Sequence, residues 1–125
     1  MPVIRHAESR RTETPNAVMT TLASPTLGGA GQALWRVDMQ PGATGPLHTF
    51  DAEQVWTVVD GGATVDLEGE KLIVMPGDTV VMPAAAPRRV CADPEVGFAA
   101  IVAASPGAWA SAPDGTGKTV PAWTV

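Results

Sequence analysis

Short apolar segments alternate with turn-forming residues along most of the chain. The segments are about four to eight residues long, the usual length of a strand, and Gly or Pro residues separate most of them. No window of about a dozen residues repeats its apolar positions every 3.6 residues, as an amphipathic helix does. The strands that this pattern predicts are residues 17–23, 33–39, 54–59, 62–67, 71–75, 79–83, 88–92 and 96–103. We therefore expect an all-β sandwich or barrel.

Two turns that contain glycine are predicted to close tight hairpins. Gly61 and Gly62 lie between two strands in VVDGGATV, and Gly69 lies between two others in VDLEGEKLIV. Glycine readily takes the positive φ angles that short β-turns require.

The segments before residue 17 and after residue 105 lack this pattern and are expected to be irregular. The second of them contains Trp109 and Trp123. Because exposed indole rings favour aggregation, we expect this segment to pack on the barrel or on a second subunit.

The composition limits the number of domains and the kinds of partner that we expect. With 125 residues, of which 45% are hydrophobic, the chain is long enough for one domain over residues 1–125. The net charge is −5, and the only adjacent basic pairs are Arg10-Arg11 and Arg88-Arg89, so we expect no nucleic-acid partner. No apolar run reaches the length of a membrane span, and residues 1–20 lack the apolar stretch of a signal peptide. We expect a cytoplasmic protein that binds neither nucleic acid nor membranes.

Gly42, His48 and Gly61, followed by Gly77 and Pro83, have spacings that resemble the two motifs of the cupin superfamily. The family's first motif is Gly, five residues, His, any residue, His, three or four residues, Glu, six residues, Gly. In this sequence Gly42, His48 and Gly61 match, while Phe50 replaces the second His and Gln54 replaces the Glu. The resemblance covers about residues 33–103.

The second motif of the family is Gly, five residues, Pro, any residue, Gly, two residues, His, three residues, Asn. Gly77 and Pro83 match it. Ala85 replaces the Gly, Arg88 replaces the His and Ala92 replaces the Asn. The glycines and prolines of both motifs are thus mostly kept, whereas the metal-binding positions are mostly changed.

The resemblance implies a double-stranded β-helix, the jelly-roll barrel of the cupins, with residues 1–16 and 104–125 as terminal segments. Cupins of one domain commonly pair through edge strands and terminal segments. We therefore expect a homodimer, which also covers the sheet edges.

Cupins typically hold a divalent metal with three His and one Glu, and these positions correspond to His48, Phe50, Gln54 and Arg88. A phenyl ring has no lone pair, and a guanidinium stays protonated and repels a cation. We therefore expect no metal cofactor. The alternative is a divalent metal held by His48 with Gln54 or Glu53, which requires a bulged strand that turns Glu53 inward.

The same positions suggest a pocket for a small organic molecule. His48 and Arg88 are the predicted catalytic residues, because imidazole titrates near neutrality and a guanidinium binds carboxylate or enolate oxygens. Phe50, Gln54 and Trp56, together with Arg88, are predicted to bind the substrate. Trp56 has the same parity as Gln54 along its strand, so both side chains are expected to face the interior.

Structural alternatives remain for both predicted catalytic residues. His48 is equally consistent with a buried histidine that only bonds a neighbour. Arg88 is equally consistent with a structural salt bridge to Asp51, Glu53 or Asp78.

Three functions are compatible with these residues. The first is a metal-independent isomerase, cyclase or lyase that acts on an anionic or carbonyl-containing molecule. The second is a metal-dependent oxygenase with substituted ligands, and the third is a binding module without catalysis.

Overall fold

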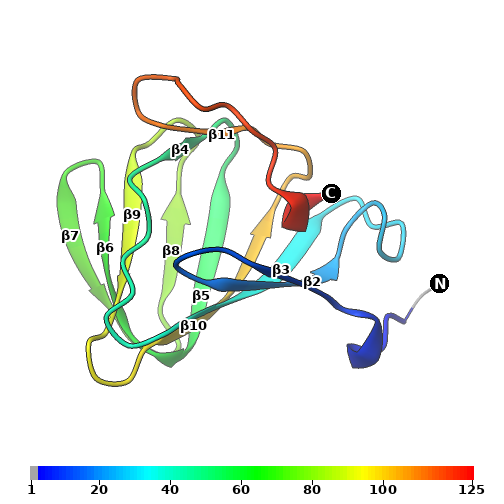
Figure 1. The fold of residues 1–125 in the computed structure, drawn as a ribbon, viewed down its shortest axis with the longest axis horizontal. Coiled ribbons are helices and arrows are strands. Elements are labelled where there is room, and N and C mark those ends of the chain that lie inside the picture. The colour runs from blue at the N-terminus through cyan, green and yellow to red at the C-terminus, as the bar shows by residue number, and fades with distance from the viewer. Residues whose placement is uncertain (1–2) are drawn as a thin grey trace.

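The computed structural model describes residues 3–125 as an arrangement of three sheets. A six-stranded sheet has the order β1-β2-β3-β10-β5-β8, a three-stranded sheet has the order β7-β6-β9, and β4 pairs with β11 (Figure 1). All strand pairs within the sheets are antiparallel. The strands are β1 (Arg10–Glu13), β2 (Val18–Ala23), β3 (Ala33–Met39), β4 (Thr49–Phe50), β5 (Gln54–Gly61), β6 (Ala63–Leu67), β7 (Glu70–Val74), β8 (Thr79–Met82), β9 (Arg88–Ala92), β10 (Phe98–Ala104) and β11 (Ala110–Ser111).

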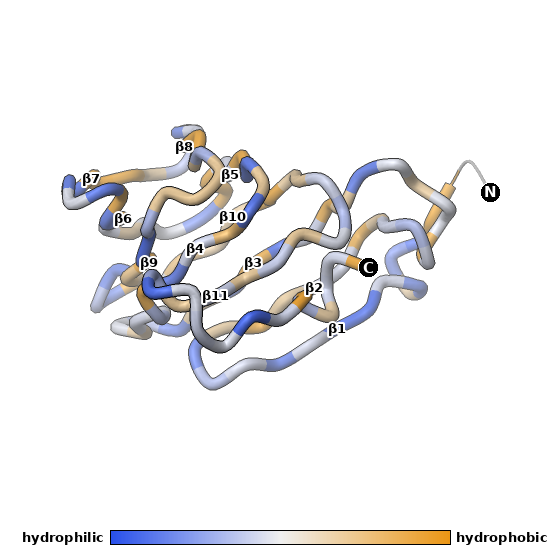
Figure 2. Tube along the Cα trace, turned by 90° about the horizontal axis from the view of Figure 1, so that it is seen from above, coloured by the Kyte–Doolittle hydropathy of each residue, from blue (hydrophilic) through white to orange (hydrophobic). Residues whose placement is uncertain are grey.

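The core lies between the six-stranded and three-stranded sheets. Along β3 and the first half of β5, every second side chain is buried, as the period of two in a strand requires. Trp35 and Val58 of the larger sheet share one cluster with Val65 and Val90 of the smaller sheet. Hydrophobic residues accordingly run along β3, β5 and β10 in Figure 2. Burial of each large apolar side chain stabilises the fold by about 1.5–3 kcal/mol.

One predicted hairpin is wrong and the other is confirmed. Strand β5 pairs with β10 and β8, whereas β6 pairs with β7 and β9, so Gly61 and Gly62 carry the chain from one sheet to the other. Gly61 has a φ of +67°, and the Gly62 N–H donates to the Gly97 carbonyl at 3.0 Å. The predicted turn at Gly69 does close a hairpin between β6 and β7, with positive φ at Glu68 and Gly69.

The terminal segments are more ordered than the sequence pattern predicts. Strand β1 pairs with β2, although its sequence RRTE has no apolar alternation, because an edge strand buries little on either face. Residues His6–Glu8 and Ala122–Thr124 form short 3₁₀ helices. In residues 3–125 no helix is long and apolar enough to span a membrane.

The C-terminal segment folds back onto the N-terminal strands of the same chain. The backbone oxygen of Val125 accepts hydrogen bonds from Arg10, Ser24 and Thr26 at 2.6, 3.0 and 2.9 Å. Trp123 packs against the core, as one of the two sequence alternatives predicts, whereas Trp109 keeps 46% of its surface exposed. The end of the chain therefore lies beside β2 and β3 (Figure 1).

Candidate functional site

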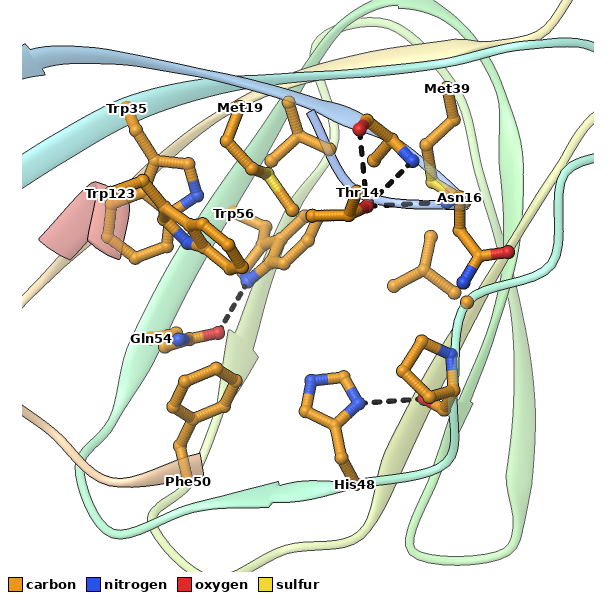
Figure 3. Close-up of a pocket in the computed structure, with 15 residues that line it drawn as sticks. Thr14, Asn16, Met19, Trp35, Met39, His48, Phe50, Gln54, Trp56 and Trp123 are labelled. Carbon is orange, nitrogen blue, oxygen red and sulfur yellow. Dashed lines mark hydrogen bonds between the residues drawn. The ribbon is translucent and has the colours of Figure 1, made fainter. Parts of the chain in front are cut away.

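A cavity of about 80 Å³ opens inside the core and is here named the inner chamber. Its apolar wall comes from both sheets and from the C-terminal segment. Figure 3 shows the indoles of Trp35, Trp56 and Trp123 gathered across the open centre from His48 and Phe50. The chamber is therefore mainly aromatic, with few polar groups on its wall.

A larger cavity of about 570 Å³, here named the vestibule, adjoins the inner chamber. The two share wall residues, among them Asn16, Met19, His48, Phe50 and Trp123. The rest of the vestibule wall comes largely from residues 110–123. The C-terminal segment thus forms one side of the approach to the chamber.

His48 lies on the wall of both cavities, immediately before β4. Its backbone pairs with that of Arg88 through two hydrogen bonds of 3.0 and 2.9 Å. Its ring atom Nδ1 is 2.7 Å from the carbonyl oxygen of Pro46. Because a carbonyl can only accept, Nδ1 carries the proton, and in the neutral ring Nε2 has a free lone pair.

The surroundings of His48 favour its neutral form. Burial is the main cause that lowers the pKa of the imidazole, and the positive charge of Arg88 lowers it further. The hydrogen bond to Pro46 acts in the opposite direction but does not outweigh burial. At neutral pH His48 is therefore a proton acceptor through Nε2.

Gln54 is oriented by its neighbour on the same strand. The side chain is 2% exposed, and its Oε1 accepts a hydrogen bond of 3.1 Å from the Trp56 indole N–H. Since an indole N–H can only donate, this bond fixes which end of the amide is oxygen. The amide N–H groups have no partner within residues 3–125, which leaves them free to donate to a ligand.

The strand register at this site is the one that the alternation predicts. Gln54 and Trp56 are buried, whereas Glu53, immediately before the strand, is exposed. Glu53 therefore does not face the chamber with Gln54. The bulge that the metal-binding alternative requires is absent from β5 at this point, where the register with β8 is continuous.

Phe50 lies between His48 and Arg88. Its ring meets the His48 ring edge-on, with the centroids 5.2 Å apart, and the Arg88 guanidinium carbon is 5.5 Å from the Phe50 centroid. Phe50 is a wall residue of both cavities, but Arg88 is a wall residue of neither.

Arg88 is buried behind Phe50 and is held by the backbone. Nε donates to the Ala86 carbonyl and one terminal nitrogen donates to the Pro83 carbonyl, both at 2.7 Å. The other terminal nitrogen is buried without a partner. Burial lowers the pKa of the guanidinium to about 10.

The salt bridge that the sequence offered as an alternative for Arg88 does not form. Within residues 3–125, no ion pair joins Arg88 to an acidic side chain. Asp51 instead accepts from the backbone of Trp109, and Asp78 accepts from the backbone of Met75. Arg88 does point inward and Arg89 outward, as the predicted register requires.

The ligand positions of the cupin motif do not fit a three-His, one-Glu metal centre in this chain. His48 offers one imidazole nitrogen, and the Gln54 oxygen is already bonded to Trp56. Phe50 offers no lone pair, and Arg88 places a positive charge nearby. No group of three His, Cys, Asp or Glu side chains suited to a metal gathers anywhere in residues 3–125.

Several wall residues lie outside the segments that the sequence motifs highlight. Thr14, Asn16 and Met19 come from the N-terminal part, and Trp123 comes from the C-terminal segment. Thr14 and Asn16 carry no sequence signal, whereas Met19 lies in the predicted strand 17–23 and Trp123 is expected to pack because an exposed indole is unfavourable. The indole N–H of Trp35, another wall residue, is buried without a hydrogen-bond partner.

Comparison with known proteins identifies the fold. KdgF from Halomonas sp. is 26% identical, with a TM-score of 0.69 over 81% of this chain and 89% of that chain. The polyketide cyclase RemF from Streptomyces resistomycificus is 20% identical, with a TM-score of 0.72 over 84% and 79% of the two chains. An RmlC-like cupin from Shewanella frigidimarina is 18% identical, with a TM-score of 0.69 over 82% and 87%. No curated protein sequence matches the chain.

The family match agrees with the motif spacing and with the all-β architecture. Residues 35–98 match the cupin domain, a region inside the predicted 33–103 that covers half of the chain. The chain therefore belongs to the cupin family.

Proposed function

We propose that the protein is a metal-independent enzyme that transfers a proton beside a carbonyl group, as isomerases, cyclases and lyases do. The observation that carries this proposal is the 2.7 Å contact between His48 Nδ1 and the Pro46 carbonyl. That contact orients the ring and leaves Nε2 as a base on the wall of an apolar cavity. The lowered pKa keeps this base unprotonated at neutral pH.

In the proposed reaction, Nε2 of His48 takes a proton from the carbon next to the substrate carbonyl. The electron pair of the broken C–H bond forms a carbon–carbon double bond, and the carbonyl oxygen takes the negative charge. The amide N–H of Gln54 donates to that oxygen. When the electrons return, the imidazolium gives its proton to another carbon in an isomerisation. In a cyclisation, the carbon instead attacks a second carbonyl and the proton goes to the new alkoxide.

Arg88 supports this reaction through its charge rather than by direct contact. The guanidinium lies behind Phe50, and two of its nitrogens are bonded to backbone carbonyls. It has no acidic partner within residues 3–125, so its field is not cancelled locally. A positive charge in a poorly solvated interior stabilises negative charge that develops nearby.

The similar structures are consistent with this class of reaction. The neighbour RemF is a polyketide cyclase, and the cupin fold also occurs in salicylate 1,2-dioxygenase, to which this chain is 21% identical. These likenesses concern the fold, so the choice between cyclase-type and oxygenase-type chemistry rests on the residues at the site. One imidazole, one bonded amide, a phenyl ring and a guanidinium favour proton transfer without a metal.

The test is proton exchange of an enolisable ketone. 2-Tetralone in D₂O at pH 7 exchanges its α-protons, which ¹H NMR follows directly. We expect the protein to accelerate this exchange and His48→Gln to reduce the acceleration by about 10²–10⁴-fold. The control is His6→Gln, since His6 is the other histidine and is exposed.

Full acceleration by His48→Gln would show that His48 is not the base. No acceleration by the wild-type protein, with 2-tetralone or with a panel of other enolisable ketones and acids, would favour the binding module instead.

A further inference from the structure

The walls of the inner chamber and the vestibule carry no formal charge. No Asp, Glu, Lys or Arg contributes to either wall. The only titratable side chain there is His48, whose lowered pKa leaves it neutral. Arg88 is close, but Phe50 stands in front of it and backbone carbonyls bind two of its three nitrogens.

An anionic group placed in the chamber would lose its water without direct contact to a cation, because Phe50 separates the chamber from Arg88. Desolvation of a carboxylate is strongly unfavourable unless a cation or several donors replace the water. The chamber wall offers instead a small set of neutral groups, namely the amide of Gln54, the ring of His48 and the side chain of Asn16, since the Thr14 hydroxyl is bonded within its own turn. So few neutral polar groups can satisfy one carbonyl or hydroxyl oxygen, but they cannot replace the water around a charged group.

The shape and chemistry of the apolar wall favour a flat ligand. Trp35, Trp56 and Trp123 surround the chamber together with Phe50, and Met19 adds a polarisable sulfur (Figure 3). Aromatic faces and thioethers contact ring systems favourably in stacked or edge-on arrangements. The vestibule, at about 570 Å³, lies within the size range of sites for small organic ligands.

We infer that the ligand of this site is a neutral, planar, fused-ring compound with one carbonyl or enol oxygen. Its ring system lies between the tryptophans and Phe50. Its oxygen accepts from the Gln54 amide, the carbon beside that oxygen faces His48 Nε2, and the rest of the molecule extends into the vestibule. This inference rests on the proposed function for the role of His48, but it is a statement about binding and has a separate readout.

The test uses two probes with the same ring system and opposite charge states. At pH 7, 2-naphthol is neutral and resembles an enol, whereas 2-naphthoate is an anion. Binding to the full chain is measured by isothermal titration calorimetry and by quenching of tryptophan fluorescence. We expect 2-naphthol to bind with 1:1 stoichiometry and at least tenfold more tightly than 2-naphthoate.

Two variants on the chamber wall, Gln54→Leu and Met19→Lys, and one control variant, Gln32→Leu, test whether the probe binds in this site. Gln54→Leu keeps the volume of the side chain but removes the donor, so it should weaken 2-naphthol by about three- to tenfold. Gln32→Leu, at an exposed position away from both cavities, should leave binding unchanged. Met19→Lys introduces a cation on the shared wall and should reverse the preference, so that 2-naphthoate binds more tightly than 2-naphthol. Urea unfolding confirms that each variant is folded.

The outcomes separate this inference from the proposed function. Equal or tighter binding of 2-naphthoate to the wild-type chain, or no binding of either probe, would overturn the ligand class even if His48 accelerates exchange. The opposite result is selective binding of 2-naphthol, in the wild type and in His48→Gln, while the wild type does not accelerate proton exchange. That result would uphold the ligand class and reject the catalytic proposal.

Discussion

The two ends of strand β5 lie in contrasting parts of the same core. At its start, Gln54 and Trp56 face the inner chamber, a cavity of about 80 Å³. At its end, Gly61 lies so close to Gly97 that an added Cβ would overlap the Gly97 carbonyl. Gly97 is similarly tight, because its own Cβ would lie 2.7 Å from the Met39 carbonyl oxygen.

This contrast explains why Gly61 is kept among the cupin motif positions. Gly61 at the closed end is fixed by the close approach of two backbones, and no other side chain fits there without a shift. At the open end, Phe50 and Gln54 face a cavity, so they can replace metal ligands without disturbing the sheets. The fold and the chemistry of this chain are therefore set by different subsets of the same motifs.

The largest stability effect is expected at the closed end. Gly61→Ala adds a Cβ that overlaps the Gly97 carbonyl, at a φ of +67°, so we expect the free energy of unfolding to fall by about 3 kcal/mol. Urea unfolding measures the change. Gly42→Ala is the matched control, since Gly42 has a similar φ of +76° but nothing within 4 Å of the added atom. The free energy of unfolding of Gly42→Ala should fall by only about 1 kcal/mol. Equal losses in the two variants would show that the close approach of Gly61 to Gly97 does not constrain Gly61.

A smaller loss of stability is expected for Arg88→Met. The change leaves the buried hydrogen-bond acceptors of Pro83 and Ala86 without their donor and removes the cation beside Phe50. We expect the free energy of unfolding to fall by about 2 kcal/mol. Arg89→Met, on the outward face, should change it by less.

The same variant tests the electrostatic role of Arg88. If its charge acts on the site, Arg88→Met should raise the pKa of His48 and move the acid limb of the exchange–pH profile to higher pH. ¹H NMR resolves this titration, because the chain has only two histidines. If the pKa of His48 is unchanged in folded Arg88→Met, the charge of Arg88 does not act on the site and its role is structural.

The pH dependence of stability should identify His48 as a half-buried group that is neutral in the folded chain. Its pKa in the folded chain lies below the ordinary value of 6.5, so between those two values the unfolded chain binds more protons. Stability that is fully present above pH 6.5 is therefore lost as pH falls toward the folded pKa, with a slope of at most about 1.4 kcal/mol per pH unit. His48→Gln should remove this contribution in urea unfolding series from pH 7 to pH 5. A slope of the opposite sign would mean that the folded chain favours the imidazolium.

The smallest effect is expected from metal removal. Since the four motif positions offer one imidazole and a guanidinium in place of three imidazoles and a carboxylate, EDTA should change neither the melting temperature nor the exchange rate. Elemental analysis of the purified protein should find no stoichiometric Fe, Mn, Ni or Zn. A bound metal that EDTA removes with loss of stability would point to donors outside the motif positions. The homodimer stays a prediction that light scattering can test.

The local sequence pattern was sufficient to predict most strands and which side chains share a face. Alternation depends only on the period of two in an extended chain, so it put Trp56 on the same face as Gln54. The inward direction of Gln54 and Arg88 came from the cupin resemblance, and only the structure decided between Glu53 and Gln54. The motif spacing likewise predicted the cupin family, because glycines and prolines at turns are constrained by the local backbone.

Tertiary structure alone decided three features of the site. Strand pairing showed that Gly61 and Gly62 join two sheets instead of closing a hairpin, which depends on contacts with the distant Gly97. The packing of Phe50 separated Arg88 from the cavity, although both residues face inward. The return of the C-terminal segment brought Trp123 to the same wall as Asn16. A cavity is formed by residues far apart in the sequence, so its wall follows from long-range packing that no local pattern encodes.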